Sequence, residues 1–158
     1  MNYQYLLSPG TIGKLKLKNR TIMAPMSAAL GNADGTVSDE LTAYLAARAR
    51  GGVGLIMTEY AFVQENGRSS DHQISVSDDR MIPGLKKMVD AVHENGAKIC
   101  LQLQHGGRRS IVELTAPSPI PMDLKQPVPQ VLTTTQVYRL VDDFIAAAVR
   151  AKKAGFDM

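Results

Sequence analysis

Three short apolar segments, each followed by a stretch with helical periodicity, constrain the fold of this chain more than any other feature. The segments read TIMAPM at residues 21–26, VGLIMTEY at 53–60 and KICLQL at 98–103. The stretches that follow them carry apolar residues at intervals of three and four, which is typical of helices with one buried face. Strands that alternate with helices indicate a parallel sheet with right-handed crossovers. We therefore expect an α/β protein, preceded by a hairpin built around KLKLK at residues 14–18.

Capping residues predict where the three helices begin and end. Ser38, Pro83 and Thr133 are typical of helix starts, whereas Gly51 and Gly96 are typical of helix ends. The long loop before the last helix, residues 104–133, carries most of the prolines, and a loop of this length usually has a function. The apolar face that the last helix should bury consists of Val137, Leu140, Val141, Phe144, Ala148 and Ala151.

The composition is that of a globular protein with one domain. The chain has 158 residues, 44% of them hydrophobic, and a net charge of +3, which allows one core and is too short for two. No basic stripe interleaved with aromatic residues is present, so nucleic-acid binding is not expected. No secretory leader is evident, and no apolar run approaches the roughly 20 residues of a membrane span. Cys100, the single cysteine, lies in an apolar run and should be buried. One cysteine cannot form an intramolecular disulfide, which fits a reducing compartment. We therefore expect a cytoplasmic protein without membrane contact.

Two α/β architectures fit this order of elements. A flavodoxin-like or Rossmann layer would need a G-x-G-x-x-G motif after the first strand to bind a dinucleotide, and the sequence has none there. A (β/α)8 barrel takes eight units and about 250 residues, of which this chain supplies about three units. The element order alone leaves both architectures open.

Five segments carry a resemblance to a known family. They are LLSPGTIGKLKLKNRTIMAPMSAAL, RARGGVGLIMTEYAFV, IPGLKKMVDAVHENGAKICLQLQHGGR, APSPI and AAAVRAKKAGFD. In sequence and in order they resemble the N-terminal portion of the Old Yellow Enzyme family, the FMN-dependent NAD(P)H:flavin oxidoreductases that include 2,4-dienoyl-CoA and 2-enoate reductases. The resemblance runs essentially from end to end of the chain.

The resemblance implies a partial (β/α)8 barrel. Residues 1–158 would form the N-terminal hairpin and about three βα units of a single FMN-binding domain, truncated before its fourth strand. NADH or NADPH would reduce the FMN, which would then reduce the C=C bond of a small enoyl or enone substrate. The groups that hold and protonate the substrate would come from later strands, so the chain alone is not expected to be active. Its open sheet edges favour pairing with a second copy, so a homo-oligomer is among the expected partners.

The resemblance also implies which residues contact the flavin. Ser27 would tune the flavin by donating to its C4 carbonyl, although a hydroxyl at this position also suits a loop cap. Gln102 is an amide within an apolar strand and would bond either the pyrimidine edge of the flavin or a neighbouring loop. Tyr60 replaces a small residue of the family, so it either turns away from the flavin or narrows the site. The full set of residues expected to bind the cofactor is Ala24, Pro25, Met26, Ser27, Tyr60 and Gln102.

The remaining polar residues predict no catalytic or metal site. Three histidines and one cysteine without a C-x-x-C motif cannot build a zinc or iron–sulfur site. His105 does not match the substrate-holding pair of the family and is expected to be structural, whereas the role of Arg108 stays open. An aldolase-like barrel is disfavoured because Lys98 opens its strand and does not close it. A non-catalytic fragment or binding module without flavin remains the main alternative.

Overall fold

A three-stranded parallel sheet lies at the centre of the structure, a computed structural model that describes residues 3–158. Its strands are β3 (Ile22–Met23), β4 (Leu55–Phe62) and β5 (Lys98–Gln104), hydrogen-bonded in that order. The α/β prediction is therefore confirmed, and these three strands do not close into a barrel. The first strand is much shorter than the predicted 21–26, because Pro25 has no N–H to donate to a ladder.

The other elements surround this sheet in chain order. The predicted hairpin is present as β1 paired with β2 in antiparallel register. The long loop contains a parallel pair, β6 with β7, that sequence patterns did not predict, since two-residue strands are too short to show a period. The bounds are α1 (Gln4–Leu7), β1 (Gly10–Ile12), β2 (Leu15–Leu17), α2 (Asp39–Arg50), η1 (Glu65–Gly67), η2 (Asp79–Met81), α3 (Ile82–Glu94), η3 (Gly107–Arg109), β6 (Thr115–Ala116), β7 (Gln130–Val131) and α4 (Thr134–Ala154).

The predicted starts of the three long helices are confirmed. The Ser38 hydroxyl accepts a hydrogen bond from the Leu41 N–H at 2.9 Å, and Pro83 lies in the first turn of α3. Thr133 caps α4 through a reciprocal capping box with Gln136. Each start is therefore set by local chemistry that the sequence already displays.

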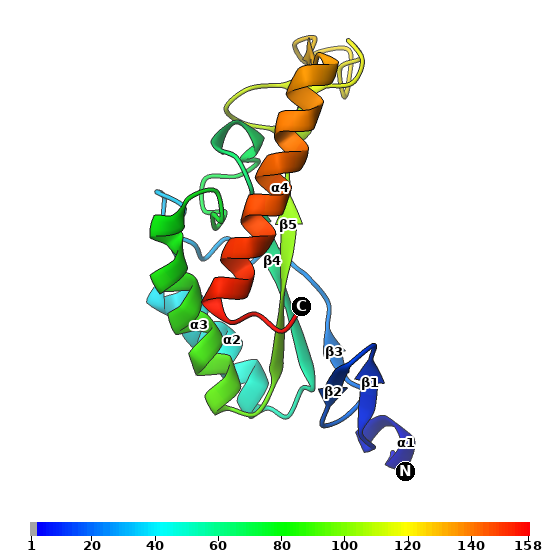
Figure 1. Cartoon of the computed structure of the whole chain (residues 1–158), viewed down its shortest axis with the longest axis vertical. Coiled ribbons are helices and arrows are strands. Elements are labelled where there is room, and N and C mark those ends of the chain that lie inside the picture. Colours follow the sequence, from blue (N-terminus) through cyan, green and yellow to red (C-terminus); the bar gives the residue numbers. More distant parts are fainter. Residues whose placement is uncertain (1–2) are drawn as a thin grey trace.

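The main hydrophobic core lies between the sheet and the three long helices, which all cover the same side of the sheet (Figure 1). It is built around buried aliphatic residues of β4, β5, α2 and α3, among them Leu41, Leu45, Ile56, Leu85, Met88, Val89, Val92 and Ile99. On the opposite side only the hairpin covers the foot of the sheet, where Leu17 packs with Leu55 and Cys100. Cys100 is buried, as predicted.

The predicted buried face of α4 is wrong in part. Val137 and Val141 are 42% and 49% exposed, and Ala148 is exposed too, whereas Ala147, Ala151 and Ala154 are buried. The small alanines let the C-terminal half of the helix approach α3 and the sheet. The N-terminal half extends beyond the sheet (Figure 1), so its valines have no layer to pack against.

The last residues attach to the free edge of β5. The Asp157 N–H donates to the Ile99 carbonyl at 3.0 Å, and the Leu101 N–H donates to the Met158 carbonyl at 2.9 Å. The Asp157 carboxylate also accepts hydrogen bonds from Lys98 Nζ and His93 Nε2, both at 2.7 Å. Residues 157 and 158 thus bond to the edge of β5 at the position that a next parallel strand would occupy.

Replacing Asp157 by Asn should cost about 1 kcal/mol of stability near neutral pH, because two charge-assisted hydrogen bonds are lost at a partly exposed site. Burial opposes ionisation of Asp157, but the hydrogen bonds from Lys98, His93 and the Ile99 N–H together outweigh it and lower its pKa. A depressed folded-state pKa means that the stabilisation is complete above the unfolded-state pKa of about 4 and is lost as the pH falls through the folded-state pKa. Urea unfolding at pH 7 and pH 3 measures this; an Asp157→Asn effect equal at both pH values would contradict it.

Leu85→Ala should destabilise the fold by about 2–5 kcal/mol, since Leu85 is 1% exposed within the core and its truncation leaves a cavity. Leu124→Ala is the matched control, because Leu124 is fully exposed and its removal should change stability by less than about 0.5 kcal/mol. Both values follow from urea midpoints at constant slope. Equal effects of the two substitutions would show that the helix–sheet core is not formed.

Candidate functional site

The carboxyl ends of the three strands bring most of the predicted site residues to one edge of the sheet. Strands of a parallel sheet end at the same edge, where active sites of such folds lie. Tyr60 on β4 and Gln102 on β5 are direct partners in the strand register. Residues 24–27 follow β3 at the same edge. The sequence-predicted residues are therefore neighbours, although they come from three separate segments.

A β-bulge aligns Tyr60 with Gln102. Met57 pairs with Cys100 and Tyr60 with Gln102, so Thr58 and Glu59 together oppose the single residue Leu101. The extra residue keeps Met57 and Tyr60 on the same face although they are three positions apart. Without it, the ring of Tyr60 would turn to the helix side of the sheet.

Gln102 is not buried, although it belongs to an apolar strand. Gln102 is exposed, and within residues 3–158 its side chain makes no hydrogen bond, because the sheet face on which it lies has no covering layer. Its neighbour Gln104 is the amide that is held in place, accepting from Gln73 Nε2 at 2.7 Å. Gln102 thus keeps a free donor and a free acceptor for a bound molecule.

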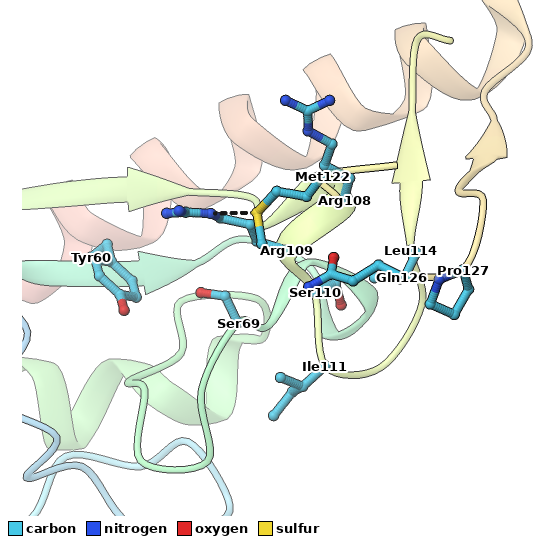
Figure 2. A pocket seen from close by; sticks show the side chains of 10 residues that line it. All are labelled: Tyr60, Ser69, Arg108, Arg109, Ser110, Ile111, Leu114, Met122, Gln126 and Pro127. Carbon is cyan, nitrogen blue, oxygen red and sulfur yellow. Dashed lines mark hydrogen bonds between the residues drawn. The ribbon is translucent and has the colours of Figure 1, made fainter. Parts of the chain in front are cut away.

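A cavity of about 580 Å³ opens beside Tyr60 (Figure 2). Its wall includes Arg108 and Arg109, and no acidic side chain among the described residues lines it. Arg109 Nε lies 3.2 Å from the Met122 sulfur, and Arg108 Nη1 donates to the Ile120 carbonyl at 3.3 Å. Neither guanidinium is neutralised by a carboxylate within residues 3–158, so the cavity is positively charged. Arg108, whose role the sequence left open, is part of its wall.

The segment after β3 is held by a buried acid that sequence reasoning missed. Glu59 Oε2 accepts hydrogen bonds from the N–H groups of Ala28 at 2.8 Å and Ala29 at 3.3 Å. Ala29 has a positive φ of 52°, which is uncommon for a residue other than glycine. Burial raises the pKa of Glu59, and the hydrogen bonds from the N–H groups of Ala28 and Ala29 reduce that shift. An acid inside the apolar run LIMTEYAF was the available signal.

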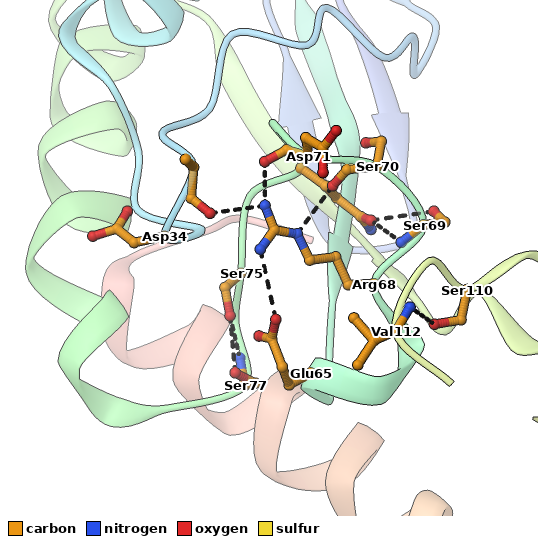
Figure 3. A network of polar contacts seen from close by, with 12 residues as sticks. Asp34, Glu65, Arg68, Ser69, Ser70, Asp71, Ser75, Ser77, Ser110 and Val112 are labelled. Atoms are coloured by element: carbon orange, nitrogen blue, oxygen red, sulfur yellow. Dashed lines mark hydrogen bonds and ion pairs between the residues drawn. The ribbon is translucent and has the colours of Figure 1, made fainter. Parts of the chain in front are cut away.

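Arg68 ties the loop after β4 to the loop after β3 (Figure 3). Its guanidinium donates to the Ser70 carbonyl at 3.0 Å, to the Ala33 carbonyl at 2.8 Å and to the Asp71 carbonyl. It also forms an ion pair of 3.6 Å with Glu65. Nothing in the local sequence indicated this contact, because its acceptors are backbone atoms, one of them 35 positions away.

His105 joins two loops. Its Nδ1 accepts a hydrogen bond from the Gly107 N–H at 3.1 Å, which leaves Nε2 to donate to Asn66 Oδ1 at 3.2 Å. Burial lowers the pKa of His105, an effect that acidic side chains nearby partly offset. Both ring nitrogens are engaged by neighbouring loop residues. No cluster of three or more potential metal ligands occurs within residues 3–158.

Gly67→Ala should destabilise the protein by about 1–3 kcal/mol, because the added Cβ would lie 2.3 Å from the His105 ring and force the two loops apart. Gly84→Ala is the control: its Cβ would meet only Val37 at an ordinary 3.7 Å, so stability should stay or rise by at most about 1 kcal/mol. Thermal unfolding of both variants measures the difference. A neutral Gly67→Ala would mean that the His105 contact between the loops is not made.

Among the helices of residues 3–158, none is both long enough and apolar enough to cross a bilayer.

Comparisons with known proteins place the chain beside flavin oxidoreductases. The model of the NADH:flavin oxidoreductase / NADH oxidase family matches residues 5–158. An NADH oxidase of Thermoanaerobacter brockii is 40% identical over 163 aligned positions, covering 99% of this chain and 25% of that protein. An NADPH dehydrogenase of Listeria monocytogenes serotype 4a is 42% identical over 156 positions, covering 97% of this chain and 46% of that protein. The chain thus spans at most about half the length of these relatives.

Solved structures agree with the sequence comparison. Morphinone reductase in complex with tetrahydroNAD is 31% identical with a TM-score of 0.88, over 97% of this chain and 47% of that one. The Old Yellow Enzyme from Pichia sp. AKU4542 is 28% identical with a TM-score of 0.91, over 98% of this chain and 44% of that one. Both matches extend over nearly all of this chain and less than half of the solved chain.

Proposed function

Because the chain belongs to the NADH:flavin oxidoreductase / NADH oxidase family, we propose that it forms the N-terminal part of an FMN-dependent enzyme. With NADH or NADPH as reductant, that enzyme reduces the C=C bond of an α,β-unsaturated carbonyl or enoyl compound. The observation that carries the proposal is the pairing of Tyr60 with Gln102 beside residues 24–27 on an uncovered sheet edge. Residues to which the family resemblance assigns cofactor contacts are thus neighbours on the sheet, which supports the proposal.

Residues 1–158 belong, in this proposal, to a single (β/α)8 barrel domain. The support is the order hairpin, strand, helix, repeated over three parallel strands with all long helices on one side of the sheet. The free edge of β5 already pairs with residues 157 and 158, as the next strand of a barrel would. The length of the relatives allows for the remaining units.

The residues present fit one side of a flavin. Gln102 offers an amide N–H and a carbonyl to a pyrimidine edge, and its exposure leaves both unused within residues 3–158. The segment from Ala24 to Ser27 follows β3 at the same edge, with Ala24, Met26 and Ser27 exposed, and its backbone can supply further donors and acceptors. A bound FMN would accept hydride from the nicotinamide and pass it to the substrate. Tyr60 lines the positively charged cavity (Figure 2), and in this proposal its ring narrows the space left for a small-molecule substrate.

By the family resemblance, the side chains that hold the substrate oxygen and protonate the product come from later strands of the barrel. We therefore propose that residues 1–158 alone have no turnover. We also propose that the complete enzyme acts in the cytoplasm. A non-catalytic role remains the second candidate. It is favoured by the exposed apolar residues of α4, such as Val141, Ile145 and Val149, which a second copy of the chain could cover.

FMN titration followed by flavin fluorescence quenching tests the proposal. Saturable quenching by the chain is expected, with binding about tenfold weaker in Gln102→Ala because one or two hydrogen bonds are lost. Gln64→Ala is the control, since Gln64 lies in a different pocket and should bind FMN like the unsubstituted chain.

The other outcomes decide between the two candidates. Absence of any quenching would favour the non-catalytic role. Oxidation of NADH by the FMN-loaded chain would overturn the proposal that the chain alone has no turnover.

A further inference from the structure

Two consecutive arginines, Arg108 and Arg109, line the cavity beside Tyr60 and have few acceptors of their own (Figure 2). Arg109 directs Nε to the sulfur of Met122, and a thioether is a weak acceptor. Arg108 directs Nη1 to a neutral carbonyl at 3.3 Å. Because a guanidinium carries five N–H donors, most donors of both side chains have no acceptor among the described residues.

A buried hydroxyl adds a neutral donor to the same wall. Ser110 is 6% exposed and lines the cavity. Its Oγ accepts hydrogen bonds from the N–H groups of Val112 at 3.1 Å and Glu113 at 3.2 Å, which engage both lone pairs. Within residues 3–158 the hydroxyl proton has no acceptor. The wall thus presents charged and neutral donors together, which is the chemistry that binds an anion.

The loop that carries the two arginines is held in place on both sides of them. Before them, the Gly106 N–H donates to the Gly67 carbonyl at 2.6 Å. A Cβ at Gly106 would lie 2.8 Å from that same oxygen, so only glycine permits this approach. After them, the Ile111 N–H donates to the Arg68 carbonyl at 2.9 Å. The backbone under the donors is therefore fixed before any ligand arrives, which lowers the cost of binding one.

We propose that this cavity is a subsite for the diphosphate group of a reactant, held by Arg108, Arg109 and Ser110. A single carboxylate would occupy one guanidinium, whereas two adjacent guanidinium groups match the two phosphates of a diphosphate. The volume of about 580 Å³ lies within the range of small-molecule sites, roughly 300–1,000 Å³.

The inference rests on the proposed function and names a part of its reactants. The cavity reaches the sheet at Tyr60, which pairs with Gln102, so a molecule whose diphosphate lies here can extend toward the proposed flavin position. Two reactants of the proposed enzyme can carry a diphosphate: the nicotinamide dinucleotide and an enoyl-coenzyme A thioester. The subsite recognises the chemistry that they share.

Calorimetric titration of the flavin-free chain with inorganic pyrophosphate tests the subsite. Saturable binding is expected, and it should be about tenfold weaker in Arg108→Ala and in Arg109→Ala, because each loses charge-assisted hydrogen bonds. Both arginines are exposed, so the variants should fold. Arg50→Ala is the matched control, since it removes the same charge from an exposed position at the end of α2. No saturable binding, or an equal loss in Arg50→Ala, would overturn the subsite.

Displacement of pyrophosphate by ADP-ribose and by coenzyme A distinguishes the two sources of the diphosphate. Displacement by ADP-ribose alone would assign the subsite to the dinucleotide, by coenzyme A alone to the thioester, and by both to the shared group. Displacement by neither would overturn the assignment to a reactant. FMN titration of the same chain separates the two proposals: pyrophosphate binding without FMN binding would overturn the proposed function, and FMN binding without pyrophosphate binding would overturn only the subsite.

Discussion

The parallel pairing of β4 with β5 is the contact on which the rest of the structure depends. One face of this pair carries Ile56 and Ile99 into the core under the helices, and the other face carries Tyr60 and Gln102 to the uncovered side. The bulge at Thr58 and Glu59 connects the two roles, because it shifts the register once without ending the ladder. The hydrophobic core and the candidate site therefore lie on opposite faces of the same pair of strands.

Three buried or half-buried polar side chains then hold the loops at the carboxyl edge of the sheet. Glu59 binds the segment after β3, Arg68 binds the loops after β3 and β4, and His105 binds the loops after β4 and β5. Glu59 and Arg68 bind backbone groups, which are abundant in loops, while Arg68 also pairs with the Glu65 carboxylate and His105 uses the side chain of Asn66. Irregular segments thus acquire fixed positions although they have few apolar contacts of their own.

Local patterns were sufficient for most elements and insufficient where burial depends on the surroundings. The starts of α2, α3 and α4 could be predicted from Ser38, Pro83 and Thr133, because capping involves atoms only a few residues apart. The face of α4 could not, since both of its sides are apolar and only the position of the sheet selects Ala147 over Val141. The burial of Gln102 could not be judged from sequence for the same reason: an apolar strand looks buried on both faces until one face is seen to lack a covering layer.

The sequence by itself determined the α/β order, the helix boundaries, the buried Cys100 and the family, because these follow from local periodicity and from residues that are adjacent along the chain. Only the tertiary structure decided which residues became neighbours. Tyr60 meets Gln102 through a register that includes a bulge, and Glu59 reaches Ala28 across 31 positions. Such contacts depend on how the chain returns in space, and a one-residue change in register would exchange every face of the strand. Local sequence therefore specified the secondary-structure elements, and tertiary packing specified which side chains meet at the candidate site.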